Sequence, residues 1–454
     1  MKLRATRGLR HQSDPSLHRM GLCHGTLTAI SSGPLLEYFT FTNGSTLVSA
    51  DLPGASLICL DFWCRGGSFW EQSGEEGMAH FLEHMVFKGS ERLQPGDFDR
   101  QIEALGGSSN AATGFDDVHF HVLVPPKETS AALDLLLDLV LHPSLDEGSF
   151  SMEREVVLEE IAQYRDQPDD LVFQKVLERC FPKHPYGRPV LGIDSSLKGM
   201  NPQGMRRYHQ RRYQGPNCCL AVAGAIPTDL ISQVRGSALT ALSNGADPSL
   251  PNPPGEGSRS TEQLPFQSGR ECHGFPRLES ARLVMVWPTA AASDPIGVAG
   301  ADLATTILSE GRRSRLVQRL REDLQIVESI DMDVTTLEQG SLVMLEACCP
   351  EEQLERVEQE INQELLRSAE EPMLEEERSR ALQLVGNGYR FSLEAPGSVA
   401  ACAGSQAVWG RQRQLLEPLN DLELWSATAL QEQVMQRLQP DQAFTLIARP
   451  AETT

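Results

Sequence analysis

A short segment near the middle of the chain carries four prolines in seven residues, from Pro248 to Pro254. Proline lacks a backbone N–H and fixes its own φ angle, so this segment cannot continue a helix or lie inside a sheet. It therefore splits the 454-residue chain into two halves of similar length. Each half shows the same order of patterns: a strand-like run, a helix, more strand-like runs, amphipathic helices and a closing strand.

This order predicts a duplicated α+β unit. Expected in the first half are strands at 55–64 and 119–125 and helices at 76–87, 130–141 and 149–164. Expected in the second half are strands at 281–287, 340–348 and 443–448, a helix at 298–309, and one or two helices within the Glu-rich stretch 351–384. We place the boundaries at an N-terminal extension 1–30, a first domain 31–243, a linker 244–270 and a second domain 271–454.

The charge balance argues against a nucleic-acid-binding protein, because phosphate recognition needs a surplus of basic groups. Here 40 Lys and Arg face 62 Asp and Glu, a net charge of −22. The acidity indicates cationic partners or serves solubility through self-repulsion alone. The sequence has no apolar run of the roughly 18 residues that a membrane span needs, so no transmembrane helix is expected.

Two further features concern the compartment. The first twenty residues carry five basic residues against the single acid Asp14, which fits either a transit peptide or a frayed terminus. The ten cysteines form no C-x-x-C motif, and several lie in apolar strand-like runs. We expect a reducing compartment such as the cytoplasm, with targeting to an organelle as the alternative.

The main chemical motif lies in the expected helix 76–87. His80 and His84 are four residues apart, so both imidazoles project from one helix face, with Glu83 beside them. The pattern is H-x-x-E-H, the reverse of the zincin order. Neutral imidazoles bind Zn²⁺ well, and a neighbouring carboxylate can accept a proton from the water that zinc activates. Two histidines buried in a core are the alternative interpretation.

A catalytic zinc needs a third protein ligand, and the helix 149–164 offers one. At 3.6 residues per turn, Glu153 and Glu160 share a face with apolar residues, whereas Glu159 points elsewhere. A carboxylate on an apolar face needs a partner. Helical geometry thus favours Glu160 as the ligand and Glu153 as a carboxylate supporting the site. The alternative is a surface helix whose faces are assigned incorrectly.

Two other clusters carry weaker signals. His119 and His121 alternate on an expected strand and share a face, which would suit a metal pair. No acidic or cysteine partner lies at a telling spacing, so we interpret them as hydrogen-bonded strand histidines. The acids between Glu370 and Glu377 are interpreted as a solvated helix face, with a cation site as the alternative.

From about Phe41 to its C-terminus, the chain resembles the pitrilysin/insulinase family of zinc metallopeptidases, the inverzincins, and within it the short branch of processing peptidases. The resemblance is strongest over residues 66–71, 77–89, 106–113, 153–160 and 184–189. The family places its glutamate ligand about 76 residues after the second histidine, and here 160 − 84 = 76.

The resemblance implies a fold and a site. The fold is α+β, with two homologous domains that each pack a mainly antiparallel sheet with helices and together form a clam-like chamber. One zinc per chain is held by His80, His84 and Glu160, with Glu83 as general base and Glu153 as a further acidic site residue. Substrate adds as an extended strand along an edge strand, which implies contacts with Gly107, Asn110 and Ala111. Without the family, Asn110 reads equally well as a turn or cap residue.

One departure from the family concerns the second half. Residues 314–322 resemble the family's S-R-L-x-x-x-L-R-E segment, in which the arginine, here Arg321, helps to bind substrate. Active relatives commonly carry a tyrosine seven residues later, where this chain has Glu328. We therefore predict the zinc subunit of a heterodimer, whose related partner supplies the Arg-Tyr pair. A homodimer is the alternative.

The sequence supports three functions in decreasing order. The first is a zinc endopeptidase acting on oligopeptides or extended presequence-like segments. The second is a non-catalytic scaffold or core subunit of the same fold, which the four intact chemical positions disfavour. The third is a binding protein whose histidine-bearing helix is structural.

Overall fold

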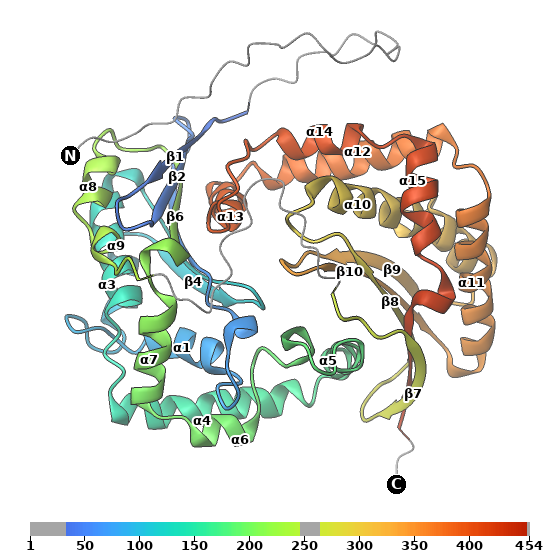
Figure 1. Cartoon of the computed structure of the whole chain (residues 1–454), viewed down its shortest axis with the longest axis horizontal. Helices are drawn as coiled ribbons and strands as arrows, with labels where there is room; N and C mark the ends of the chain where they lie inside the picture. Colours follow the sequence, from blue (N-terminus) through green and yellow to red (C-terminus); the bar gives the residue numbers. More distant parts are fainter. Residues whose placement is uncertain (1–32, 246–263, 452–454) are drawn as a thin grey trace.

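The structure is a computed structural model that describes residues 33–245 and 264–451. The predicted N-terminal extension, most of the predicted linker and Cys23 lie outside the described residues. Two sheets, each covered by helices, face one another across the molecule (Figure 1). The predicted α+β class and the duplication are both confirmed, because the two sheets repeat one topology.

The first sheet has six strands in the order β1-β2-β6-β3-β5-β4. Only β2 and β6 run parallel, and the other neighbours are antiparallel. The strands are β1 Leu36–Thr40, β2 Thr46–Asp51, β3 Ile58–Cys64, β4 Ser108–Thr113, β5 Val118–Val124 and β6 Cys218–Gly224. The helices of this half are α1 Met78–Val86, α2 Asp97–Ala104, α3 Thr129–Leu141, α4 Glu147–Tyr164, α5 Pro168–Cys180, α6 Asp194–Gly199, α7 Pro202–Arg212, α8 Leu230–Arg235 and α9 Ala238–Ala241.

The second sheet has five strands in the order β7-β11-β8-β10-β9, with only β7 and β11 parallel. The strands are β7 Gly269–Phe275, β8 Ala281–Thr289, β9 Ser329–Thr335, β10 Ser341–Cys349 and β11 Phe444–Pro450. The helices are α10 Pro295–Ser309, a π-helix Val317–Asp323, α11 Leu354–Glu370, α12 Glu375–Ser392, α13 Pro396–Ala407, α14 Glu417–Glu423 and α15 Ala427–Gln433. Strand for strand, β7, β11, β8, β10 and β9 occupy the positions of β2, β6, β3, β5 and β4.

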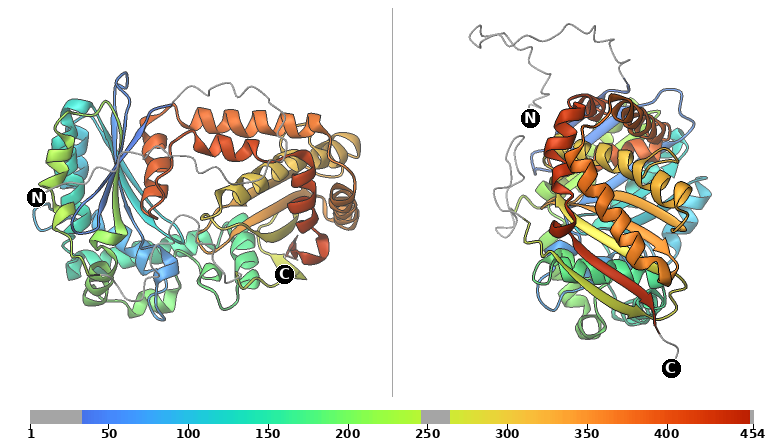
Figure 2. Two further views of the ribbon diagram at one scale, coloured as in Figure 1. Left: turned by 45° about the horizontal axis from the view of Figure 1, so that its top comes forward. Right: turned by 90° about the vertical axis from the view of Figure 1, so that its right-hand side faces the viewer.

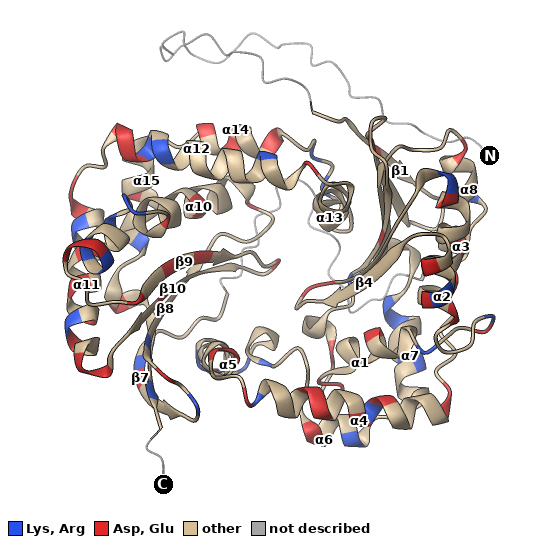
Figure 3. Cartoon of the chain, turned by 180° about the vertical axis from the view of Figure 1, so that it is seen from behind, with Lys and Arg blue, Asp and Glu red and all other residues tan. Residues whose placement is uncertain are grey.

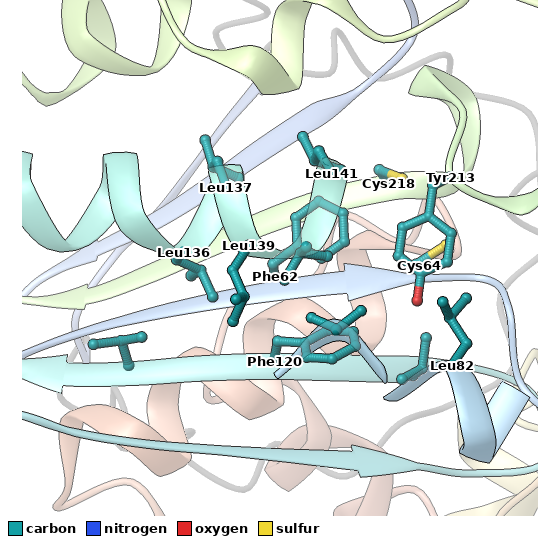
Figure 4. Packing of buried hydrophobic residues seen from close by; sticks show 14 of the residues in the cluster. Phe62, Cys64, Leu82, Phe120, Leu136, Leu137, Leu139, Leu141, Tyr213 and Cys218 are labelled. Carbon is teal, nitrogen blue, oxygen red and sulfur yellow. The ribbon is translucent and has the colours of Figure 1, made fainter. Parts of the chain in front are cut away.

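Alternation along the central strands divides each sheet into two faces. On β5, Phe120 and its even-numbered neighbours are fully buried, while His119 and His121 are only partly covered. Figure 4 shows Phe62 and Phe120 packing with leucines of α3, among them Leu136 and Leu139. The odd-numbered residues of β3 and β5 therefore lie on the opposite face, which looks toward the second half.

That opposite face is covered in part by a helix from the other half. Helix α13 packs on β2, β3 and β6, and its Val399, Ala400 and Ala403 are buried there (Figure 2). The approach is close: a Cβ on Gly404 would lie 2.3 Å from Trp63 Nε1. Reciprocally, α5 of the first half packs on β7 and β11 of the second. Each half thus lends one helix to the sheet of the other.

A cavity of about 590 Å³ lies between the two halves. Trp63 and Phe115 line it from the first half, and Leu337, Tyr389 and Leu415 line it from the second. This arrangement agrees with the predicted chamber. No helix in the two described ranges is both long and apolar enough to cross a membrane.

Candidate metal centre

Helix α1 carries both histidines, and its start is fixed by two residues. Gly77 precedes the helix with φ of 95°, a left-handed conformation that glycine adopts without strain. The buried carboxylate of Glu71 accepts hydrogen bonds from the backbone nitrogens of Gly77 (3.0 Å) and Ala79 (2.8 Å). These bonds satisfy N–H groups that have no partner inside the helix. The helix therefore begins at a defined residue, and this sets the direction of its histidine face.

The structure brings His80, His84 and Glu160 together. Oε2 of Glu160 lies 3.3 Å from Nε2 of His84 and 3.7 Å from Nε2 of His80, and one donor atom from each residue falls within 4.8 Å of the others. A tetrahedral shell with zinc bonds of about 2.0–2.1 Å places neighbouring donor atoms about 3.4 Å apart. The donor set and its spacing therefore fit a zinc ion.

The protonation state of His80 suits a metal ligand. Burial, and then the neighbouring His84, lowers the pKa of His80 to about 4. The neutral imidazole, which is the form that binds metal, therefore persists at physiological pH. The other ring nitrogen of His80, Nδ1, is buried and has no hydrogen-bond partner among the described residues.

Glu153 contacts a histidine ligand and not the space between the ligands. Its Oε1 lies 2.9 Å from Nδ1 of His84, and Nζ of Lys88 lies 2.7 Å from its Oε2. A carboxylate on Nδ1 holds the ring in one tautomer and leaves Nε2 free for a metal. This contact is the positioning arrangement that helical periodicity predicts for Glu153, and it places the side chain outside the catalytic group.

The apolar face of α4 is narrower than the sequence predicts. Val156, expected on that face, is 50% exposed, whereas Val157 and Ile161 are buried. Glu160 lies at the edge of the buried face and keeps 41% of its side chain exposed. The carboxylate is thus open to the interior of the molecule on one side.

Glu83 is joined to the sheet by a contact that sequence reasoning missed. Thr113 Oγ1, at the end of β4, donates a hydrogen bond to Oε2 of Glu83. Burial raises the pKa of Glu83 above its usual range. A raised pKa brings a carboxylate closer to the operating pH, which suits a group that takes up and returns a proton. The alternation of β4 gave no signal for this contact, because it depends on how α1 packs beside the strand.

The predicted substrate contacts lie at the edge of the first sheet. Strand β4 is terminal in the strand order and pairs only with β5. Asn110 is exposed on it, with Oδ1 accepting a hydrogen bond from the backbone nitrogen of Ala111 at 2.9 Å. Gly107 precedes the strand and donates its N–H to the carbonyl of Ile102.

Arg321 is not brought to this site by any contact. It lies on the π-helix of the second half, where its guanidinium pairs with Glu322 at 3.1 Å. Within residues 33–245 and 264–451, no hydrogen bond or ion pair joins it to the histidine helix. Glu328, at the position of the expected tyrosine, accepts hydrogen bonds from Ser280 Oγ (2.9 Å) and Cys348 Sγ (3.1 Å).

Comparisons with known proteins agree with this geometry. An uncharacterised zinc protease of Bacillus subtilis is 25% identical over 91% of this chain and 98% of its own length. Another, from Rickettsia bellii, is 26% identical over 74% of this chain and 79% of its own. A crystal structure of a protease from Helicobacter pylori has a TM-score of 0.82 at 21% identity, covering 92% of this chain and all of that one.

A crystal structure from Pseudomonas fluorescens described as a peptidase M16 inactive domain gives a TM-score of 0.80 at 16% identity, over 92% of this chain and 98% of that one. Two family models match consecutive parts of the sequence. Residues 47–194 match the insulinase family, peptidase family M16, and residues 199–385 match the M16 inactive domain. The chain therefore belongs to the M16, or insulinase, family of peptidases.

Proposed function

We propose that this protein is a zinc-dependent endopeptidase that hydrolyses oligopeptides or extended presequence-like segments. The observation that carries the proposal is the convergence of His80, His84 and Glu160, with Glu83 on the same helix as the two histidines. The names of the related zinc proteases support the same chemistry. The free thiols of the nine described cysteines accord with a reducing compartment such as the cytoplasm.

The proposed mechanism assigns one task to each side chain. Zinc bound by the two imidazoles and Glu160 would supply Lewis acidity toward the scissile carbonyl and the attacking water. Glu83 takes a proton from that water and returns it to the nitrogen of the leaving amine. Thr113 holds the Glu83 carboxylate in place, and Glu153 holds the ring of His84.

Substrate binding is proposed along β4. An extended peptide can add to an edge strand through main-chain hydrogen bonds, which hold it without reading much sequence. Because Thr113 belongs to β4 and contacts Glu83, a peptide on this strand would lie beside the catalytic group. Asn110 and Ala111 are the proposed contacts.

The second sheet suggests a preference for basic segments. Asp331 and Asp333 are exposed on β9, and Glu346 lies opposite Asp331 on β10 (Figure 3). These acids share the sheet face on which α5 packs, because the alternate residues of the same strands face the other core. An acidic wall would attract cationic peptides.

A heterodimer is part of the proposal. The metal ligands are complete, whereas Glu328 stands where active relatives have a tyrosine, and Arg321 contacts only Glu322. We propose that a related subunit supplies the missing pair. Full peptide cleavage by the purified, zinc-loaded, monodisperse chain alone would contradict this part of the proposal.

The test of the central activity is Glu83→Gln. This change removes the proton acceptor and leaves all three proposed ligands, so zinc content should stay at the parental level. Peptide hydrolysis should fall by about 10²–10⁴-fold, the usual contribution of a general base. Equal turnover by the variant and the parent would contradict the mechanism.

The second candidate is a non-catalytic subunit of the same fold. The match of residues 199–385 to a domain described as inactive, together with Glu328, favours it. It predicts no hydrolysis by the parent protein, alone or with a related partner, so the same assay separates the two candidates.

A further inference from the structure

A second cluster of potential metal ligands lies on the first sheet, outside the site described above. It consists of Asp61 on β3 and His119 and His121 on β5. Asp61 is directly opposite His121 in the antiparallel register, and His119 is two residues away on the same face. The sequence gave no acidic partner for the two histidines, because Asp61 comes 58 residues before His119.

The three side chains share one small space. One donor atom from each lies within 4.8 Å of the others, and Oδ1 of Asp61 lies 3.0 Å from Nδ1 of His119. The rings of His119 and His121 stack with centroids 5.8 Å apart, and Trp63 stacks on His119 at 4.3 Å. These contacts fix the direction of the His119 ring.

From this geometry we propose that Asp61, His119 and His121 bind a second divalent metal ion of the zinc class. Two imidazoles and one carboxylate are a common ligand set for such ions, and they leave further coordination positions open. This proposal stands independently of the proposed peptidase activity, because it uses none of the same residues.

Burial of the carboxylate favours a metal over a simple ion pair. The side chain of Asp61 is only 1% exposed, and a buried charge needs compensation. His119 contributes one hydrogen bond to it. The imidazole nitrogens of His121 have no hydrogen-bond partner among the residues the structure describes, although the ring lies against the same pair. A divalent cation would use this second imidazole and balance the carboxylate.

The location points to the interior of the molecule. The cluster occupies the odd-numbered face of β3 and β5, opposite the core formed with α3. On the neighbouring edge strand, Asn110 pairs with His121 and Ala112 with His119. The proposed ion would thus lie beside the strand on which we propose that substrate binds.

The test is a zinc count on the purified full-length chain. After saturation with zinc and removal of the excess, mass spectrometry of the metal should find about two ions per chain. His121→Ala and His84→Ala should each leave about one ion, and the double variant should leave none. His142→Ala, which removes a half-exposed histidine from outside both clusters, should retain both ions.

His121 is replaced in place of Asp61, because removing the buried carboxylate endangers folding. Circular dichroism and the melting temperature should confirm that the His121→Ala chain is folded. One zinc per parent chain, lost in His84→Ala and unchanged in His121→Ala, would overturn this inference and leave the proposed peptidase intact. One zinc lost only in His121→Ala would support this inference and overturn the metal centre on α1.

Discussion

At the scale of single residues, the choice between two adjacent glutamates decides whether α4 can complete a metal centre. Glu160 reaches both histidines, whereas Glu159 is exposed on another side of the helix. The two side chains have the same charge and length, so they form a matched pair for mutagenesis.

Glu160→Gln should therefore abolish stoichiometric zinc binding and peptide hydrolysis, because an amide is a poor replacement for a carboxylate ligand. Glu159→Gln should retain both. Zinc analysis after dialysis and a fluorogenic peptide assay check the pair. Loss of zinc in both variants, or in neither, would contradict the assignment of Glu160.

Glu153→Gln probes the support of His84. The amide keeps the size of the side chain but loses the charge that pairs with His84 and Lys88. Losing such a supporting group costs about 10–100-fold in metal affinity, and we expect that range here. Competition with a zinc chelator measures it, with the exposed Glu155→Gln as the control. An unchanged affinity would show that Glu153 does not position His84.

Residue-scale prediction from sequence succeeded where one helix carries the signal. His80, His84 and Glu160 follow from a period of 3.6 residues, and the structure brings them together. Thr113 and Asp61 did not follow, because each meets its partner only through the packing or register of a strand. Lys88 escaped notice for a similar reason, since its contact with Glu153 joins two helices.

At the scale of elements, the start of α1 depends on a side chain outside the helix. Glu71 provides both acceptors for the first turn, from a position six residues before Gly77. Any change there should move the histidines that follow.

Glu71→Ala should lower the free energy of unfolding by about 1–3 kcal/mol, because it leaves buried N–H groups without acceptors. It should also weaken zinc binding, since the helix start is no longer fixed. Urea denaturation and chelator competition measure these effects, with the exposed Glu91→Ala as the control. A variant as stable as the parent would show that water or other groups replace the lost acceptors.

Elements with a strong internal period were predictable, and each strand and helix expected from the sequence is present. The Glu-rich stretch forms two helices, α11 and α12. What the sequence left out is where α5 and α13 pack. The small residues of α13, such as Ala400 and Ala403, gave no sign that their contacts lie on a sheet more than 170 residues earlier in the chain.

At the scale of the whole molecule, the loops of two equivalent hairpins meet between the halves. Asp116, between β4 and β5, accepts hydrogen bonds from Tyr186 Oη (2.8 Å) and from the backbone nitrogen of Glu338 (3.0 Å), between β9 and β10. Nearby, Arg411 forms a bidentate pair with Glu338. Burial raises the pKa of Asp116 to about 7.

This raised pKa gives stability a defined pH dependence. The folded chain holds the Asp116 proton more tightly than the unfolded chain, whose carboxyl has its ordinary pKa near 3.8. Stability from this group is therefore present below about pH 4 and is lost as the pH rises to about 7, by at most about 1.4 kcal/mol per pH unit. Asp116→Asn cannot ionise and should flatten this part of the profile. Urea midpoints between pH 4 and 8 for both chains measure the difference, and parallel profiles would contradict it.

The reciprocal placement of α5 and α13 has a consequence for the covalent chain itself. Each sheet is completed by a helix that belongs to the other half, so the halves hold one another as two hands with interlaced fingers do. A protease site engineered between residues 246 and 263 should then yield two fragments that co-elute in gel filtration and keep their zinc. Ala400→Glu, which charges a buried position of α13, should release them. Fragment complementation would follow: the two pieces, made separately, should assemble only with each other, so that neither half is an independent protein.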